Sequence, residues 1–479
     1  GATGSLQSQI RRMIASAVAE RHLMPGDPVP SSRELSEILG VARNTVVLAY
    51  QQLVDEGLLV SHERSGCFVS PDAEAGWAAA TPARPAAAPS DRAPDWTRRL
   101  TQDLSAQRNI TKPQHWQKHP YPFVCGQFDP ALFPLADWRE CSRMALGVTE
   151  VRDWAPDLVD GDDPLLIEQL RTRILPRRGV FAAPDEIMVT IGAQQALFIL
   201  AELLLTRRGT MGIEDPGYPD ARNIFARRTP NLLPLPLDRD GLIVGERVAS
   251  CDLLYVTPGH QSPTTATMPP ERRRALMQLA AEADILLIED DYEIETSFGG
   301  RPEPALKSQD PDGRVLYVGS LSKTLAPGLR LGYMVAPAPV ILQARLLRRL
   351  MVRHPALNNQ RAVALFLSLG HHDALLHRMV HVLKLRAQIL AEALDRHLPA
   401  YERQGGQGGS SFWLRGPKGL DARRLAAAAL EEGIVIEPGD VFFMDEAAGR
   451  NCFRLGFGSI AQERIEPGIA KLARLAERF

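Results

Sequence analysis

A proline- and alanine-rich segment, residues 71–96, divides this chain into two parts of very different length. Its centre, residues 81–94, lacks helical or strand periodicity and cannot pack a core. Each flanking part must therefore bury its own apolar residues. The 479 residues, 45% of them hydrophobic, suffice for two or three domains. We predict a small domain over residues 1–70, a linker over 71–96 and a large domain over 97–479.

The small domain has the pattern of a helix, a glycine turn and a second helix. Ser31 or Ser32 can cap the first helix with help from Glu34, and Gly40 supplies the turn. Two amphipathic helices across such a turn form a helix-turn-helix. After it, residues 58–69 read as two short strands, a wing. The predicted apolar faces comprise Leu35, Ile38 and Leu39 in the first helix and Val46, Val47, Tyr50, Leu53 and Val54 in the second.

The start of the second helix is where such a motif contacts DNA. Arg43, Asn44 and Thr45 occupy those positions. Arg33 and Arg64 fall at the start of the first helix and in the wing, where phosphates would lie. The charge of this domain does not decide the matter, because six arginines, no lysine and seven acidic residues give a formal balance of −1. A small helical cap on an enzyme is the alternative interpretation.

The large domain carries a lysine in a loop rich in hydroxyls and glycine. Lys323 follows a predicted strand over residues 314–318, with Ser320, Ser322 and Arg330 close by in sequence. A lysine that forms an imine with pyridoxal phosphate needs phosphate-binding groups beside it. A surface lysine in a glycine turn would have the same local sequence, so this motif needs support from others.

A second segment, residues 284–292, is an apolar strand that ends in carboxylates and a phenol. The pyridine ring of the cofactor withdraws electrons only while its nitrogen is protonated, and an adjacent carboxylate keeps the proton there. We assign that role to Asp290. Asp291, or a solvated strand end with no such role, are the alternatives.

Two further segments complete the predicted cofactor site. Residues 187–195 read as a strand, a glycine turn and a helix start, where N–H groups of Gly192, Ala193 and Gln194 can bind phosphate. The helix is predicted to run from about Gln194 to Leu205. Residues 213–218 end another strand in a turn carrying Tyr218, which can stack on a flat heterocycle.

Together these segments resemble the fold-type I aminotransferases over residues 122–479. The resemblance implies an α/β domain with a mixed, mostly parallel sheet and a smaller C-terminal subdomain. It also implies that Lys323 forms the imine, that Asp290 pairs with the pyridine nitrogen, and that Arg454 grips the carboxylate of the ligand. Arginine suits that last role because its planar donors pair bidentately with carboxylates. An arginine held in a salt bridge on a core strand is the alternative.

The N-terminal region resembles the GntR-type winged helix-turn-helix over residues 23–69, and the fusion of both modules resembles the MocR family of bacterial transcription regulators. The shared motifs are Asp215 to Tyr218, His260 to Pro263, Glu289 to Tyr292 and Ser320 to Lys323. By that resemblance, Tyr218 stacks on the cofactor ring and Tyr292 hydrogen-bonds its phenolic oxygen.

The sequence departs from the enzymes at two places. Where aminotransferases have Asn-Pro-x-Gly, this chain has Ser262 to Thr265, so Ser262 replaces the amide at the cofactor and the glycine is lost. Tyr292 follows Asp290 by two positions, one fewer than is usual. Both changes suit a module that binds the cofactor under relaxed demands for turnover.

We therefore predict a pyridoxal-phosphate-dependent transcription regulator that senses an amino compound by imine exchange at Lys323. The resemblance suggests an ectoine-derived diamino acid. A working aminotransferase with an appendage and a regulator without cofactor are the alternatives. Expected partners are promoter DNA and a second copy of the chain. Five cysteines without paired spacing, no metal-ligand spacing and no membrane segment or signal peptide fit a cytoplasmic protein.

Overall fold

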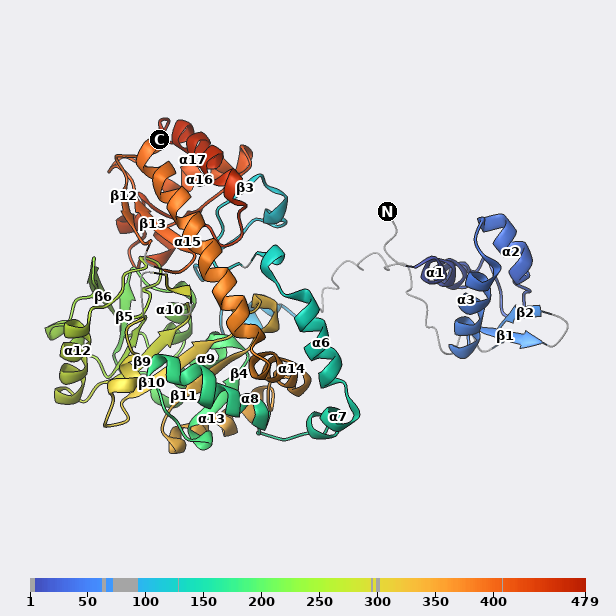
Figure 1. Cartoon of the computed structure of the whole chain (residues 1–479), viewed down its shortest axis with the longest axis horizontal. Coiled ribbons are helices and arrows are strands. Elements are labelled where there is room, and N and C mark those ends of the chain that lie inside the picture. The colour runs from blue at the N-terminus through green and yellow to red at the C-terminus, as the bar shows by residue number, and fades with distance from the viewer. Residues whose placement is uncertain are drawn as a thin grey trace. The chain divides into compact units, whose positions relative to one another are not determined.

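The computed structural model describes residues 5–62, 66–71, 94–127, 129–293, 296–298, 302–406 and 408–479. Its contacts divide the chain into two compact units, Gly1–Asp103 and Leu104–Phe479, which we describe separately (Figure 1). Most of the predicted linker, residues 72–93, lies outside the described residues, and so does Arg64 of the predicted wing.

Unit 1 contains the predicted helix-turn-helix and wing. Ser31 caps the second helix: its hydroxyl accepts the Glu34 N–H at 3.2 Å, and the Glu34 carboxylate accepts the Ser31 N–H at 3.4 Å. Such a capping box contributes about 1 kcal/mol. Gly40 ends this helix at a φ of 63°. The elements are α1 (Leu6–Ala19), α2 (Ser32–Leu39), α3 (Arg43–Asp55), the antiparallel β1 (Leu59–His62) and β2 (Gly66–Val69), and α5 (Trp96–Arg99).

The core of unit 1 forms around α3, whose Val46, Tyr50 and Leu53 are buried against Leu35 of α2 and Ile14 of α1. The predicted apolar faces are only partly right. Ile38 is 67% exposed, Leu39 36% and Val47 38%. Of the eight residues of α2, only Leu35 and Ser36, in the middle of the helix, are buried. The C-terminal turn of α2, with Ile38 and Leu39, extends past the edge of the core.

Unit 2 is built on a large mixed sheet with the strand order β4-β11-β10-β9-β8-β5-β6-β7. The pairs β10–β9, β9–β8, β8–β5 and β5–β6 are parallel, whereas β11 and β7 are antiparallel to their neighbours. The strands are β4 (Ile187–Thr190), β5 (Met211–Asp215), β6 (Leu232–Asp238), β7 (Gly241–Leu242), β8 (Leu253–Val256), β9 (Leu286–Asp291), β10 (Val315–Ser320) and β11 (Gly332–Val335).

The central strands are buried along almost their whole length, which explains their uninterrupted apolar sequences. Apolar residues of α9 and α13 pack with these strands in one cluster, and those of α12 pack with them in another. The helices that precede the C-terminal subdomain are α6 (Leu135–Ala145), α7 (Val148–Trp154), α8 (Pro164–Gln169), α9 (Gly192–Leu204), α10 (Pro219–Ala226), α11 (Glu246–Ala249), α12 (Pro270–Glu282), α13 (Ala338–Met351), α14 (Leu357–Ser368) and α15 (His371–His397).

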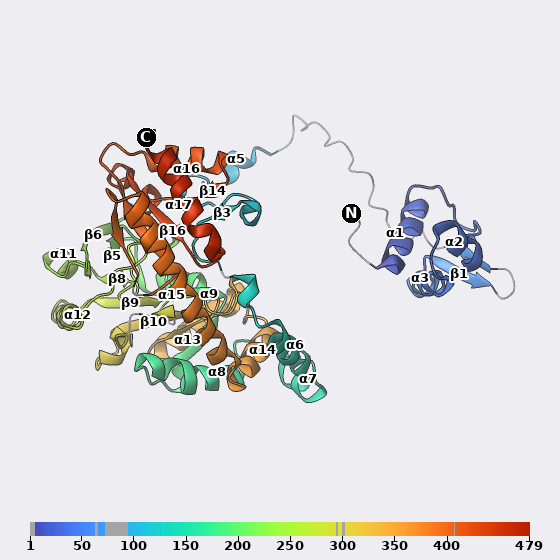
Figure 2. The ribbon, with the colours of Figure 1, turned by 45° about the horizontal axis from the view of Figure 1, so that its top comes forward.

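A smaller C-terminal subdomain lies at one end of this unit, and α15 runs from the large-sheet region into it (Figure 2). Its sheet has the order β12-β13-β16-β15, and β14 pairs separately with β3 from the start of the unit. Its elements are β3 (Tyr121–Pro122), β12 (Glu402–Gln404), β13 (Ser411–Arg415), β14 (Ile434–Val435), β15 (Glu437–Pro438), β16 (Cys452–Gly456), α16 (Ala422–Glu431) and α17 (Gln462–Ala476).

Candidate functional site

The residues predicted to bind the cofactor converge at the carboxyl ends of the parallel strands. Lys323 follows β10, Asp290 lies near the end of β9, and the two strands are aligned so that Asp290 faces Val318. Tyr218 follows β5, and Ser262 follows β8. This edge is where open α/β sheets bind ligands.

Lys323 is half-buried, with its Nζ 5.9 Å from the centre of the Tyr292 ring. The loop that carries it is held by Ser322, whose hydroxyl donates to the Leu331 carbonyl and accepts the Leu331 N–H, both at 3.1 Å. Burial lowers the pKa of Lys323; Glu293 opposes this shift, while Arg454 reinforces it. A lowered pKa favours the neutral amine, which is the form that attacks an aldehyde.

Asp290 is buried and has one oxygen to spare. Its Oδ2 accepts the Tyr255 hydroxyl at 2.8 Å, whereas its buried Oδ1 has no hydrogen-bond partner among the described residues. Burial raises the pKa of Asp290 to about 7, against the lowering effects of Tyr255 and Lys323. A buried acceptor without a donor is costly, so this oxygen fits the protonated ring nitrogen of pyridoxal phosphate.

The predicted phosphate cup consists of the backbone N–H groups of Gly192, Ala193 and Gln194 at the start of α9. Gly192 has a φ of +71°, and a Cβ there would lie 3.0 Å from Nη2 of Arg330. The Arg330 guanidinium therefore sits beside the helix N-terminus, which favours anions. Gly332 permits this arrangement, since a Cβ there would lie 2.7 Å from the Gly192 carbonyl carbon and 2.9 Å from the Ala193 nitrogen.

Two other predicted phosphate ligands, Gln194 and Ser320, lie beside charged side chains. Gln194 donates from Nε2 to Asp220 at 2.6 Å, and its Oε1 is 3.5 Å from Nη2 of Arg330. Ser320 lines a small cavity with Arg178 and Asp291. Arg178 and Asp291 form a buried ion pair of 2.6 Å. The positive charge of Arg178 is therefore already paired with a carboxylate.

The hydroxyls of both predicted aromatic residues have polar partners, and that of Tyr218 accepts a hydrogen bond from Nε2 of Gln194 at 3.4 Å. The Tyr218 hydroxyl donates to Asp220 at 3.0 Å. Tyr292 shares a side-chain hydrogen bond with Ser262, and burial raises its pKa well above the ordinary tyrosine value. Thr265, which stands where the enzymes have glycine, adopts a φ of +64°, a conformation that is strained for a β-branched residue.

Arg454 is paired inside the protein. From β16 its Nε and Nη2 both donate to Oε2 of Glu437 on β15, at 2.9 and 2.7 Å, and its guanidinium lies 4.8 Å from the centre of the Phe442 ring. The other oxygen of Glu437 accepts the Cys125 N–H at 3.2 Å and lies 3.8 Å from Nζ of Lys112. Although burial opposes it, Arg454 and Lys112 hold the pKa of Glu437 below its usual value.

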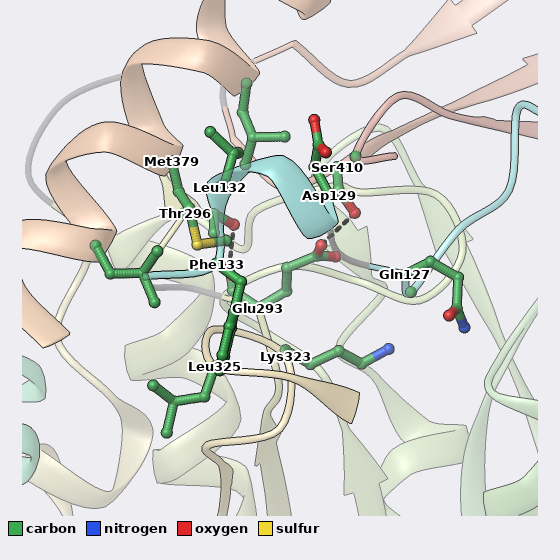
Figure 3. Close-up of a pocket in the computed structure, with 14 residues that line it drawn as sticks. Gln127, Asp129, Leu132, Phe133, Glu293, Thr296, Lys323, Leu325, Met379 and Ser410 are labelled. Atoms are coloured by element: carbon green, nitrogen blue, oxygen red, sulfur yellow. Dashed lines mark hydrogen bonds between the residues drawn. The ribbon is translucent and has the colours of Figure 1, made fainter. Parts of the chain in front are cut away.

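A cavity opens beside Lys323 (Figure 3). Leu132, Phe133 and Met379 give it an apolar wall, and Glu293 gives it a carboxylate. Glu293 accepts a hydrogen bond from Ser410 and lies 3.7 Å from Nε2 of His260.

His260 does not supply a cation to this carboxylate, because burial lowers the pKa of His260 and favours the neutral imidazole. Gly126 leaves space at the lysine, since a Cβ there would lie 2.7 Å from Nζ of Lys323. The cavity therefore offers an anionic side chain and an approach to the lysine amine.

Four of the predicted DNA-contacting residues, Arg33, Arg43, Asn44 and Thr45, are described by the structure and lie in unit 1. Arg43 donates from Nε to the Ser32 hydroxyl at 3.3 Å, which places the starts of α2 and α3 side by side. Arg33 pairs with Glu37 at 3.3 Å. Arg33, Arg43 and Asn44 are exposed, and Thr45 is half-buried. Two adjacent helix N-termini with exposed arginines suit phosphate contacts.

Both units of the chain match known protein families. Residues 6–69 match the gntR family of bacterial regulatory proteins, and residues 163–472 match aminotransferase class I and II. The chain is 44% identical to the HTH-type transcriptional regulator TauR of Rhodobacter capsulatus, over 99% of this chain and 97% of that protein. It is 30% identical to the rhizopine catabolism regulatory protein MocR of Rhizobium meliloti, over 98% of this chain and 93% of that protein.

The chain belongs to the MocR family of transcription regulators. Its unit 2 is also similar to the α-aminoadipate aminotransferase of Thermus thermophilus, solved with N-(5'-phosphopyridoxyl)-L-leucine, at 27% identity and a TM-score of 0.69 over 80% of this chain and 99% of that one. The predicted fold class is thereby confirmed, and so is pyridoxal phosphate as the cofactor of this MocR-type domain. The GntR-type domain binds DNA. Within the described residues, no helix is long and apolar enough to cross a membrane, and no acidic, histidine and cysteine side chains cluster as metal ligands.

The sequence motifs of this MocR-family chain did not point to Tyr255, Glu293, Glu437 or Lys112. Glu293 directly follows Tyr292, so the motif itself could have indicated it. Tyr255 is the one aromatic in the strand Leu253–Val256, and a phenol in an otherwise aliphatic strand indicates a buried polar partner. Glu437 and Lys112 gain their roles from tertiary contacts alone.

Proposed function

We propose that this chain regulates transcription by sensing an amino compound, whose amine displaces Lys323 from the cofactor and thereby changes DNA binding. The observation that carries this proposal is the free buried oxygen of Asp290 beside a lysine of lowered pKa, within a chain that also has a GntR-type domain. We further propose that the protein acts as a homodimer in the cytoplasm.

The residues of the site have separate roles in this proposal. The cofactor supplies an aldehyde carbon that bonds to an amine and a ring that withdraws electrons. Asp290 would accept a hydrogen bond from the protonated ring nitrogen and so keep the proton there. Lys323 would be released as a free amine, with a proton taken from the nitrogen of the effector that replaces it. Gly192, Ala193, Gln194, Ser320, Ser322 and Arg330 would hold the phosphate, and Tyr218, Tyr292 and Ser262 would hold the ring.

The cavity suggests the class of effector. Arg454, which is not among the residues that line the cavity, supplies a cation for an acid group, and Glu293 inside the cavity supplies a carboxylate beside Lys323, the Ser410 hydroxyl and the His260 imidazole. An effector with an acid group, one amine for the cofactor and a second amine for Glu293 would match all three positions. We therefore propose a short diamino acid, such as 2,4-diaminobutyrate, which agrees with the ectoine-derived class expected from the sequence.

The test uses full-length protein loaded with cofactor and a DNA duplex that the protein itself selects from a random library. DNA affinity is titrated with 2,4-diaminobutyrate, γ-aminobutyrate and taurine, which differ in their acid group and second amine. We expect the diamino acid to shift DNA affinity several-fold, which needs a coupling of about 1–3 kcal/mol. In Glu293→Gln the preference for the diamino acid over γ-aminobutyrate should disappear. A DNA affinity that none of the amines alters would contradict the sensing role.

A working aminotransferase is the second candidate, because Lys323 and Asp290, the groups on which transamination depends, are both present. The same samples decide between the two functions when keto-acid formation is followed in parallel. Sustained keto-acid release with unchanged DNA affinity would favour the enzyme. Little turnover with altered DNA affinity is what we expect.

A further inference from the structure

The 108–112 segment, Arg108–Lys112, touches both halves of the candidate sensor site. It lies near the start of unit 2, which begins at Leu104. Along the chain it follows the predicted linker that leads from the DNA-binding domain. A ligand signal that passes along the covalent chain must therefore pass through this segment.

Its first two residues contact the cofactor side. The Arg108 carbonyl accepts hydrogen bonds from Nη2 of Arg222 at 3.3 Å and from Nδ2 of Asn223 at 3.1 Å, both on α10. Asn109 lies beside both Asn223 and Asp220: its Oδ1 accepts a hydrogen bond from Nδ2 of Asn223 at 2.6 Å, and with the amide turned over its nitrogen would lie 3.1 Å from Oδ1 of Asp220. The other oxygen of Asp220 accepts hydrogen bonds from Tyr218 and Gln194, two predicted cofactor ligands.

Its last residues contact the acid-binding side. Ile110 packs against the apolar cluster that contains Phe442, and the ring of Phe442 lies beneath the guanidinium of Arg454. Lys112, with a side chain 28% exposed, lies 3.8 Å from Glu437, and Glu437 in turn holds Arg454. The 108–112 segment thus lies close to Tyr218 by way of Asp220. It lies close to Arg454 by way of Glu437.

We infer that the 108–112 segment carries the ligand state of the sensor toward the DNA-binding unit, with Lys112 as the residue that responds to the acid group of the effector. This inference rests on the proposed sensing function. An acid group at Arg454 competes with Glu437 for the same guanidinium and repels its carboxylate. Glu437 then shifts toward Lys112, and the ion pair between them tightens and holds the segment against the sensor. The effector thus binds better to one of two segment positions, as a population shift requires.

The first experiment measures the segment itself. Hydrogen exchange of amides in residues 104–113 is followed in the full chain without cofactor, with cofactor, and with cofactor plus 2,4-diaminobutyrate. We expect protection to rise with cofactor, through Asp220, and again with the amine, through Glu437. Unchanged protection in all three states would overturn the inference, whatever the DNA affinity does.

The second experiment measures transmission. Lys112→Met removes the charge and keeps the length of the side chain, and Lys118→Met is the matched control, because Lys118 is an exposed lysine six residues further on. At saturating amine, the ratio of DNA affinities with and without the amine should fall from several-fold toward one in Lys112→Met and keep its wild-type value in Lys118→Met. A full ratio in Lys112→Met would refute the assigned role.

The two proposals fail in different ways. If wild-type DNA affinity responds to none of the amines, the sensing function fails. The hydrogen-exchange comparison with and without cofactor then still tests whether the 108–112 segment is coupled to the cofactor site. Raised protection supports that coupling, and unchanged protection contradicts it.

Discussion

Tyr255 donates a hydrogen bond of 2.8 Å to one oxygen of Asp290, and the other oxygen of this buried carboxylate has no partner among the described residues. Two more buried carboxylates, Glu214 and Glu289, lie nearby in the sheet, and burial raises the pKa of each to about 7. Without cofactor, the sheet edge therefore holds acids whose protonated forms are favoured up to about pH 7. A cation at Asp290 relieves part of this cost.

This relationship predicts how the stability of the cofactor-free protein depends on pH. The pKa of Asp290 is about 7 in the folded protein against 3.8 ordinarily, so the folded state binds more protons and stability falls as the pH rises from about 4 to about 7. Cofactor-free Asp290→Asn should come close to the wild type at about pH 3.5, below both pKa values, and melt several degrees higher at pH 8, with a gain of up to about 4 kcal/mol. Thermal unfolding at both pH values tests this.

Cofactor should reverse that order. In the loaded protein the protonated ring nitrogen pairs with Asp290, so at pH 8 the wild type should melt higher than Asp290→Asn. If cofactor stabilised both proteins equally, Asp290 would have no part in binding the ring.

Lys323→Ala should abolish covalent attachment of the cofactor. Borohydride reduction followed by peptide mapping should label Lys323 in the wild type and nothing in the variant, and cofactor affinity should fall roughly tenfold or more. Lys384→Ala, at an exposed lysine on α15, is the control and should label normally. A label on any other lysine would show that the assignment is wrong.

The sequence predicted those parts of the site that depend on local motifs. Lys323 follows its strand within a few residues, and Asp290 lies within its own strand, so strand order brought them together once the fold was identified. The partner of Arg454 could not be predicted in this way. Glu437 lies opposite Arg454 because β15 and β16 pair antiparallel in that register. The two residues are seventeen positions apart in the sequence, and the pairing register between their strands depends on how the whole subdomain packs. The exposure of Ile38 and Leu39 could not be predicted for a similar reason. A periodic apolar pattern in one helix does not show how far the neighbouring helix extends to cover it.

Charge reversal at Arg43 should weaken DNA binding across all sequences. Arg43 begins α3 beside the start of α2, and a phosphate or base contact there contributes about 1–3 kcal/mol. Arg43→Glu should also reduce the salt dependence of binding by about one ion if the contact is to phosphate. Arg274→Glu makes the same charge change at an exposed position on α12 and should bind normally. Equal gel shifts for the two variants would rule out α3 as the DNA-contacting helix.

Gly126→Ala should slow the exchange of amines at the cofactor. The φ of Gly126 is +66°, and the added methyl carbon would lie 2.7 Å from Nζ of Lys323, so both the backbone and the lysine must shift. We expect the rate at which absorbance changes after addition of amine to fall by about tenfold, equivalent to about 1.4 kcal/mol. Gly245→Ala is the control, because a Cβ there meets open space. An unchanged rate would show that amines approach from another side.

The close contact between Gly332 and the start of α9 determines which mutations the phosphate cup tolerates. Its donors are main-chain N–H groups, so exchanging the side chains of Ala193 or Gln194 leaves the donors themselves in place. At Gly332 a single methyl group would collide with the Gly192 and Ala193 backbone and displace the donors together. In a saturation mutagenesis screen for cofactor retention, the most intolerant positions of the cup should therefore be the two that have no side chain.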